Sequence, residues 1–143
     1  MKTLNLHVDY IKFKPLKKAL KSIADLPEKE KQEHEVKEAL VVLTAVEKSD
    51  TDVDKIVEKY IENIKDIAKQ VNAKNIVLYP YAHLSKELGS PQIAQEILIK
   101  AEEELKKLKL QNTKLKMTIV LNTQYYLLKN CLTKIIILRT LGI

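Results

Sequence analysis

Residues 79–85, Tyr-Pro-Tyr-Ala-His-Leu-Ser, hold the side chains in this chain that are best suited to binding and proton chemistry. His83 carries an imidazole, a side chain that can exchange a proton or donate a hydrogen bond. Tyr79 and Tyr81 offer aromatic faces on which a nucleobase can stack, and Pro80 removes one backbone donor. We expect a binding loop for a base, a sugar or an acyl group. A turn whose aromatic side chains lie in the core is the alternative.

The other reactive side chains indicate neither a metal centre nor a covalent nucleophile. His34 lies in a highly charged run and is expected on the solvated surface, whereas His7 lies in a predicted strand. Cys131, the single cysteine, stands between two apolar runs, where an inert buried thiol is expected. Only two glycines occur, so neither a P-loop nor a dinucleotide-binding fingerprint can be present. We therefore expect no metal ion and no cofactor.

The loop follows directly on a predicted strand, which is where α/β proteins place their binding crevices. Residues 39–47 and 75–81 are short apolar runs typical of buried strands. Residues 53–72 between them have the periodicity of an amphipathic helix, with N-cap candidates at 49–54. This strand–helix–strand unit predicts two parallel strands joined by a right-handed crossover. The carboxyl ends of the two strands then share one edge of the sheet.

The N-terminal third predicts one strand and one or two helical segments. Residues 2–8 alternate apolar and polar side chains, as a half-buried strand does. Residues 16–26 are expected to form a helix that Pro15 opens and Pro27 stops. The very polar residues 28–39 are expected to form an exposed helix or an ordered loop.

The C-terminal part predicts a second long helix and then strands. Ser90 caps this helix and Pro91 occupies its first position. Three apolar runs in the tail are too close together for parallel crossovers. They lie at residues 117–121, 125–128 and 134–138. The fold class is therefore α/β, with a mixed sheet built around the βαβ unit.

Both long helices have an apolar stripe that predicts which side chains are buried. In the helix at 53–72 the stripe consists of Ile56, Tyr60, Ile64, Ile67 and Val71. In the helix that begins at Pro91 it consists of Ile93, Ile97, Leu98, Ala101, Leu105 and Leu108. With 143 residues the chain suits a single domain over 1–143, which buries roughly 70% of the surface of its unfolded chain.

The excess positive charge is confined to the C-terminal part. The chain has 25 basic and 19 acidic residues, a formal charge of +6, and no acid follows Glu104. Residues 105–143 contain eight basic side chains, so residues 1–104 contain 17 and are slightly acidic. Contact with a polyanion such as nucleic acid and a solvated lysine-rich helix end are the two explanations. One cysteine, no membrane-spanning run and no signal-peptide pattern favour the cytoplasm.

Three segments carry a resemblance to a known family. They are MKTLNLHVDY at 1–10, VVLTAVEK at 41–48 and, most specifically, NIVLYPYAHLS at 75–85. They look like the N-terminal editing domain of archaeal threonyl-tRNA synthetases, and the helix that begins at Pro91 continues the likeness. The resemblance covers about residues 1–110, and Val8 replaces a Ser usual in that family. It implies a fold similar to that of D-aminoacyl-tRNA deacylases.

The resemblance implies hydrolysis of seryl-tRNA mischarged on threonine tRNA. In that family a water attacks the ester with help from the ribose 2′-hydroxyl of the 3′-terminal adenosine, and no acyl-enzyme forms. Carried onto this chain, His83 is the catalytic candidate that positions the substrate or the water. Pro80, Tyr81 and Ala82 would form the wall of the aminoacyl pocket. The adenosine would face Ala45, Val46 and Glu47.

The tail departs from the family pattern. Two family motifs that supply a Lys and a Glu to the site are absent from residues 111–143. Tyr126 and Lys129 match the first motif weakly, at shifted spacing, and are taken as candidate substrate-binding residues. Three explanations remain open: a divergent tail that keeps strands without the catalytic groups, a site rebuilt with these two residues, or translation of the gene in an altered frame.

Three functional hypotheses follow. The first is the proofreading hydrolase, forming a homodimer and fused to, or working with, an aminoacylation domain. The second is a catalytically weakened RNA-binding or assembly module of the same fold. The third is an unrelated α/β scaffold. The expected partner of the first hypothesis is the 3′-terminal aminoacyl-adenosine of tRNA, and no membrane is expected.

Overall fold

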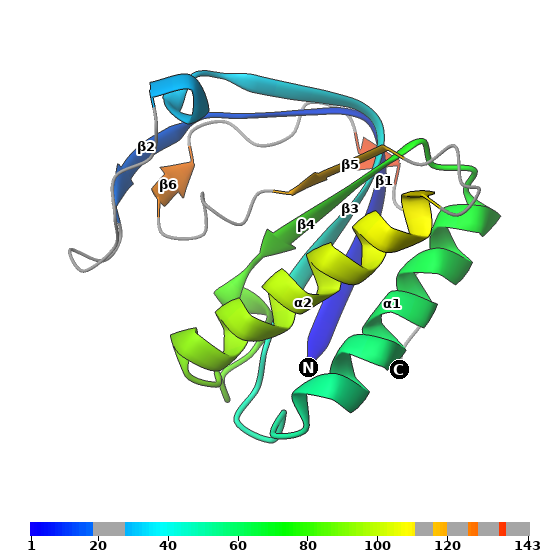
Figure 1. The fold of residues 1–143 in the computed structure, drawn as a ribbon. Helices are drawn as coiled ribbons and strands as arrows, with labels where there is room; N and C mark the ends of the chain where they lie inside the picture. The colour runs from blue at the N-terminus through cyan, green and yellow to red at the C-terminus, as the bar shows by residue number, and fades with distance from the viewer. Residues whose placement is uncertain (19–27, 111–115, 120–125, 129–134, 137–143) are drawn as a thin grey trace.

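Seven strands are seen in the computed structural model, which describes residues 1–18, 28–110, 116–119, 126–128 and 135–136 (Figure 1). Their bounds are β1 Lys2–Phe13, β2 Pro15–Lys18, β3 His34–Ala45, β4 Asn75–Pro80, β5 Lys116–Ile119, β6 Tyr126–Leu128 and β7 Ile135–Ile136. Five of these strands form one sheet in the order β5-β4-β3-β1-β7, and β2 pairs with β6 in a separate two-stranded sheet. The pairing β3–β4 is parallel, as is β4–β5, whereas β1 pairs antiparallel with β3 and β7. The predicted α/β fold with a mixed sheet is confirmed.

Two long helices cover one face of the five-stranded sheet (Figure 1). Helix α1 spans Val53–Gln70 and lies between β3 and β4 in the chain, so the predicted βαβ unit is present. Its N-cap is Asp52, whose carboxylate accepts the Lys55 N–H at 3.2 Å. Helix α2 spans Pro91–Leu110, and the predicted Ser90 cap accepts the Ile93 N–H at 3.3 Å. Two short 3-10 helices, η1 Glu28–Lys31 and η2 Ala82–Leu84, complete the described elements.

The helices bury their apolar faces on the sheet. From α2, the predicted Ile97, Leu98, Ala101 and Leu105 are buried, and Ile93 and Leu108 are partly buried. From α1, Tyr60 and Ile64 are buried as predicted. The stripe of α1 is rotated relative to the prediction, because Val57, Ile61 and Ala68 are buried while Ile56, Ile67 and Val71 lie at its border. Packing against two neighbours at once, sheet and α2, broadens the buried face beyond a single row of side chains.

The first strand is longer than predicted. Its alternation of buried and exposed side chains changes phase after residue 8, which hid the continuation in the sequence pattern. Residues 2–8 were expected, whereas β1 continues to Phe13, and β3 begins at His34 where an exposed helix or loop was expected. Leu6 and Val8 share one cluster with Ile11 and Phe13, so the buried positions shift from even to odd numbers. Opposite this shift Glu38 has a φ of 48°, and its carbonyl accepts the Lys74 N–H at 3.1 Å. The register is the same on both sides of this point, with Val8 paired to Ala39 and Tyr10 to Lys37, so the strand pair continues while its buried positions exchange.

The predicted helix at 16–26 is wrong at its start, because Pro15–Lys18 forms strand β2, paired with β6. Proline is tolerated at the first residue of an edge strand as well as at the start of a helix, so the local signal did not decide between them. Residues 19–27 lie outside the described residues. The three tail runs correspond to β5, β6 and β7, each shorter than its predicted run within the described residues.

Candidate functional site

The parallel pair β3–β4 brings the two predicted groups of site residues to one edge of the sheet. The register pairs Thr44 with Pro80, the last residue of β4. Ala45 ends β3, and Val46 and Glu47 follow it at the same edge as residues 80–83. Ala45 and Val46 are buried, Glu47 and Pro80 are half-buried, and Tyr81, Ala82 and His83 are exposed.

His83 lies in the middle of η2, a single turn that follows β4 directly. Two backbone bonds close this turn, Leu84 N to Tyr81 O and Ser85 N to Ala82 O, both at 3.3 Å. At its start the Tyr81 N–H donates to the Thr44 carbonyl at 2.7 Å, which ties the turn to β3. His83 is exposed to solvent.

The aromatic rings of this segment form an edge-to-face series. Tyr79 and Tyr81 have ring centroids 6.3 Å apart at an interplanar angle of 61°. Tyr81 and His83 have centroids 5.3 Å apart at 64°. Tyr81 is 38% exposed and Tyr79 is half-buried, so the alternative of a turn with its aromatic side chains in the core is wrong for Tyr81. Each ring supports the next through its edge.

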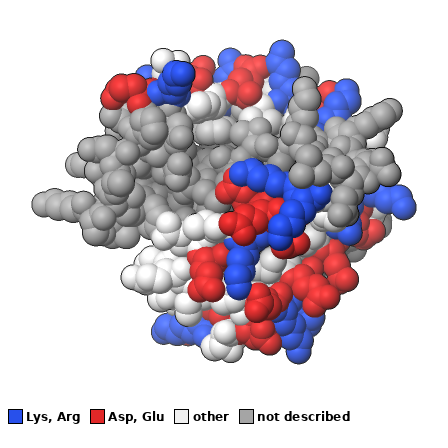
Figure 2. Space-filling view, in the orientation of Figure 1, with Lys and Arg blue, Asp and Glu red and all other residues white. Residues whose placement is uncertain are grey.

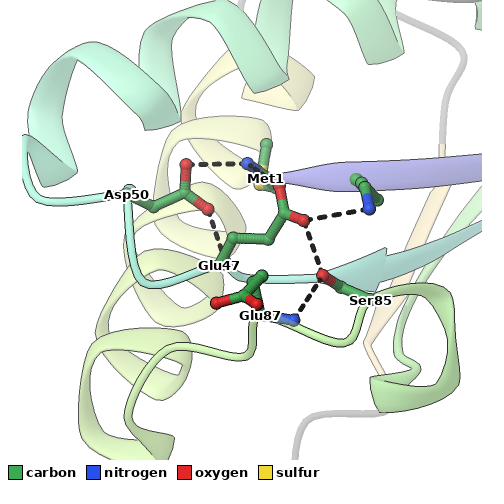
Figure 3. A network of polar contacts seen from close by, with 6 residues as sticks. Met1, Glu47, Asp50, Ser85 and Glu87 are labelled. Atoms are coloured by element: carbon green, nitrogen blue, oxygen red, sulfur yellow. Dashed lines mark hydrogen bonds and ion pairs between the residues drawn. The ribbon is translucent and has the colours of Figure 1, made fainter.

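A polar network behind the loop is centred on Glu47 (Figure 3). Its carboxylate accepts the Ser85 hydroxyl at 2.5 Å, pairs with the Met1 α-ammonium at 3.2 Å and pairs with Lys2 Nζ at 3.2 Å. The hydrogen bond from Ser85, followed by the bond from the Met1 ammonium, lowers the pKa of Glu47 from 4.5 to about 2. At neutral pH this side chain is therefore a carboxylate whose charge is balanced from within the molecule.

Asp50 completes the network from the loop after β3. It is 7% exposed, and its carboxylate accepts the Met1 ammonium and the Glu47 N–H, each at 2.7 Å (Figure 3). Asp50 was one of several N-cap candidates in the sequence, but Asp52 caps α1 instead. The two carboxylates thus share one ammonium, which offsets their mutual repulsion.

Backbone hydrogen bonds join the segment that follows η2 to the residues after β3. Lys48 N donates to Glu87 O and Gly89 N donates to Val46 O, both at 2.9 Å. A Cβ at Gly89 would lie 3.0 Å from Glu47 O, so the close approach requires glycine here. These contacts hold residues 85–89 over the Glu47 backbone.

A buried hydrogen bond supports the same edge from the core side. The Thr44 and Tyr60 hydroxyls lie 2.6 Å apart, and both residues are almost fully buried. Burial raises the pKa of Tyr60 above its ordinary value. The Thr44 hydroxyl also contacts Val42 O at 3.2 Å, while its carbonyl holds Tyr81. Thr44 therefore links helix α1 to the His83 loop.

Of the remaining candidates, the structure describes Tyr126 and His34. Tyr126 begins β6, whose partner is β2 in the separate sheet, and Lys129 and Cys131 lie outside the described residues. His34 is half-buried with its ring stacked on Phe13 at 5.3 Å, so the expected solvated position is wrong. Within the described residues, no three His, Cys, Asp or Glu side chains gather as metal ligands, and no helix is long and apolar enough to cross a membrane.

Comparison with known proteins shows to which family the chain belongs. Residues 1–116 match the family model of the archaea-specific editing domain of threonyl-tRNA synthetase. The chain belongs to this family. A threonine–tRNA ligase from Thermococcus onnurineus (strain NA1) is 44% identical over 107 residues, and one from Methanosphaera stadtmanae is 45% identical over 106 residues. These matches cover 74% and 73% of this chain and 17% of each relative, so the chain spans about a sixth of the length of these relatives.

Membership in the editing-domain family overturns the hypothesis of an unrelated α/β scaffold. The match includes the segment with Pro80 to His83 and the whole network around Glu47. It ends at residue 116, just inside β5, so the strands β6 and β7 lie beyond it.

The part of the surface of the editing domain that the structure describes carries both acidic and basic side chains. On the face in Figure 2, acidic and basic side chains are interspersed over its described part. On the helices, Lys100 pairs with Asp54 at 2.8 Å and Lys107 pairs with Glu104 at 2.6 Å. The part of the helix face that the structure describes therefore favours the solvated-helix explanation over a polyanion-binding surface for these lysines.

Five residues of the site were not predicted as such: Met1, Lys2, Thr44, Asp50 and Ser85. Ser85 had a local signal, because its hydroxyl accepts the Glu87 N–H at 3.1 Å, a turn typical of Ser two positions before the donor. Met1 and Asp50 had none, since 49 positions separate them in the chain.

Proposed function

We propose that this editing domain hydrolyses the ester of seryl-tRNA mischarged on threonine tRNA, as a cytoplasmic proofreading step of translation. An aminoacylation site that binds threonine discriminates against serine by only about 1–3 kcal/mol of binding free energy, because serine lacks just one methyl group. A second, hydrolytic site is therefore needed. Membership in the editing-domain family, together with the meeting of residues 45–47 and 80–83 at one sheet edge, carries the proposal. The fold is then expected to group with D-aminoacyl-tRNA deacylases.

The 3′-terminal adenosine would bind at the ends of β3 and β4. In this arrangement Ala45, Val46 and Glu47 face the adenosine. The aminoacyl group lies against Pro80, Tyr81 and Ala82. The small, exposed Ala82 suits a seryl group, and the exposed Tyr81 ring borders it. Tyr126 and Lys129 stay candidates for substrate binding from the tail.

The chemistry proposed is direct attack of water on the ester carbonyl carbon. The ribose 2′-hydroxyl assists the water, the bond to the 3′-oxygen breaks, and that oxygen takes up a proton, which yields serine and uncharged tRNA. His83 is exposed at the rim and positions the substrate or the water through its imidazole. No acyl-enzyme intermediate forms.

The test is deacylation of seryl-tRNA(Thr) by the chain. We expect hydrolysis well above the buffer rate, a partial loss in His83→Ala, and near-inert substrate when the terminal ribose is 2′-deoxy. Hydrolysis at the buffer rate would reject the proposal. Full activity on the deoxy substrate together with complete loss in His83→Ala would instead make His83 a general base.

A weakened RNA-binding or assembly module is the second candidate, favoured by one observation. The family match ends at residue 116, and the following residues contain no acid and no histidine. This candidate predicts binding of a non-hydrolysable 3′-seryl-adenosine analogue without turnover of seryl-tRNA.

We further propose that the domain forms a homodimer and is fused to, or works with, an aminoacylation domain. The relatives are about six times longer than the matched region, which supports the second part. The strands β5 and β7 border the five-stranded sheet, and a partner that covers an edge would protect it. A monomer at micromolar concentration in light scattering would contradict the dimer.

A further inference from the structure

We propose that Ser85 and Glu47 form a latch that sets the position of His83, with Glu47 as a positioning residue. The proposal deepens the proposed function and rests on it for its rate measurement. The latch is the bond from the Ser85 hydroxyl to the Glu47 carboxylate at 2.5 Å (Figure 3).

The turn that carries His83 cannot hold its own shape. Helix η2 has three residues, and its two internal bonds are long, at 3.3 Å. Such a turn is marginal in isolation, because few bonds offset the cost of ordering the backbone. Besides the edge contact between the Tyr81 and His83 rings at 5.3 Å, its geometry depends on contacts at its two ends. These are Tyr81 N to Thr44 O at 2.7 Å before it and the Ser85–Glu47 latch after it.

The anchor of the latch is itself held rigidly. The Glu47 side chain is only 15% exposed, and its two oxygens are shared among Ser85, Lys2 and the Met1 ammonium. Asp50 fixes the Glu47 backbone through its N–H at 2.7 Å. A side chain locked by several partners is suited to position a neighbouring catalytic group.

The direction of the Ser85 bond follows from its second partner. The Ser85 oxygen accepts the Glu87 N–H at 3.1 Å, so the hydroxyl proton is left for Glu47. Removing the hydroxyl would not release the whole segment, because Glu87 and Gly89 keep their backbone bonds to Lys48 and Val46. Ser85→Ala therefore removes the latch at the end of η2 and the acceptor of the Glu87 N–H, and it leaves the bond from Tyr81 N to Thr44 O in place.

The experiment compares Ser85→Ala, Ser85→Thr, Glu47→Ala and the Ser85→Ala/Glu47→Ala double variant in deacylation of seryl-tRNA(Thr). The control is Asp54→Asn, which breaks the exposed ion pair with Lys100 between the two helices. We expect Ser85→Ala to lower kcat about tenfold with KM within about twofold, since displacing a positioned group by an ångström costs up to ~100-fold. Ser85→Thr, which keeps the hydroxyl, restores kcat. The double variant is no slower than Glu47→Ala, and Asp54→Asn matches the wild type.

A second readout needs no activity. It is the NMR signals of the His83 imidazole in the free protein, assigned by their loss in His83→Gln. Both Ser85→Ala and Glu47→Ala should shift or broaden them, whereas Asp54→Asn should not.

Two outcomes would overturn the latch. One is unchanged His83 resonances in Ser85→Ala. The other is a double variant in which the rate effects of the two single variants multiply. If Glu47→Ala does not fold, the Ser85→Ala and Ser85→Thr pair decides alone. Absence of hydrolysis by the wild type would reject the proposed function, and the resonances would still decide on the latch.

Discussion

Removing the buried hydroxyl pair at Thr44 and Tyr60 tests how the core supports the site edge. Tyr60→Phe deletes one partner of a 2.6 Å bond, but the Thr44 hydroxyl keeps its contact with Val42 O. We expect a loss of about 1 kcal/mol in the free energy of unfolding, the net worth of one hydrogen bond. Thr44→Val leaves the Tyr60 hydroxyl buried, at 1% exposure, without this partner. Its expected cost is about 2 kcal/mol, within the range for an unsatisfied buried polar group.

The double variant separates a coupled pair from two independent contributions. With both polar groups gone, no unsatisfied hydroxyl remains, so the double variant should lose only about 1 kcal/mol where independent effects would sum to about 3. The assay is urea unfolding of the four proteins, with the midpoint shifts converted at a common slope. A double variant whose loss lies within about 0.5 kcal/mol of the sum would refute the reasoning.

Further outcomes follow from the network and the glycine. Because the folded-state pKa of Glu47 is about 2 against an ordinary 4.5, its stabilisation is complete above about pH 4.5 and is lost as the pH falls toward 2. The stability difference between wild type and Glu47→Gln, measured by urea unfolding, should thus shrink over this window, and a constant difference would contradict it. Gly89→Ala places a Cβ 3.0 Å from Glu47 O and should cost about 1–3 kcal/mol in thermal unfolding. The exposed neighbour Leu88, changed to Ala, should cost under ~0.5 kcal/mol. A Gly-Ser extension before Met1 replaces the ammonium bound by Asp50 with a neutral amide and should cost about 2 kcal/mol in thermal unfolding. An unchanged melting temperature with the N-terminal extension would show that the ammonium contact contributes nothing.

The βαβ unit and helix α2 could be predicted because their signals are local. The periodicity of residues 53–72 and the Ser90-Pro91 start report burial and capping within one helical turn. The parallel pairing of β3 and β4 then followed from the helix between them, and with it the edge that carries His83. The residue types of the Tyr-Pro-Tyr-Ala-His-Leu-Ser segment were enough to mark it as the candidate site.

The N-terminal region could not be predicted in the same way. Residues 15–18 have a proline and lysines that suit the start of a helix, but their partner in the tail makes them a strand. Past residue 8 the buried positions of β1 shift from even to odd numbers, and Glu38, with a left-handed backbone, lies on β3 opposite this shift. Strand identity is decided by what lies beside the strand, and that neighbour is distant in the chain.

The succession of local sequence patterns thus predicted where His83 lies, which is directly after a buried parallel strand. What holds His83 there required the folded molecule. Ser85 and Glu47 are 38 positions apart, and Met1 and Asp50 are 49 apart. No periodicity or short motif links residues at such separations, because their contact arises only when β1, β3 and the loop after β4 converge at one edge. Glu47, expected from the resemblance to face the adenosine, has its carboxylate bound within the protein for the same reason.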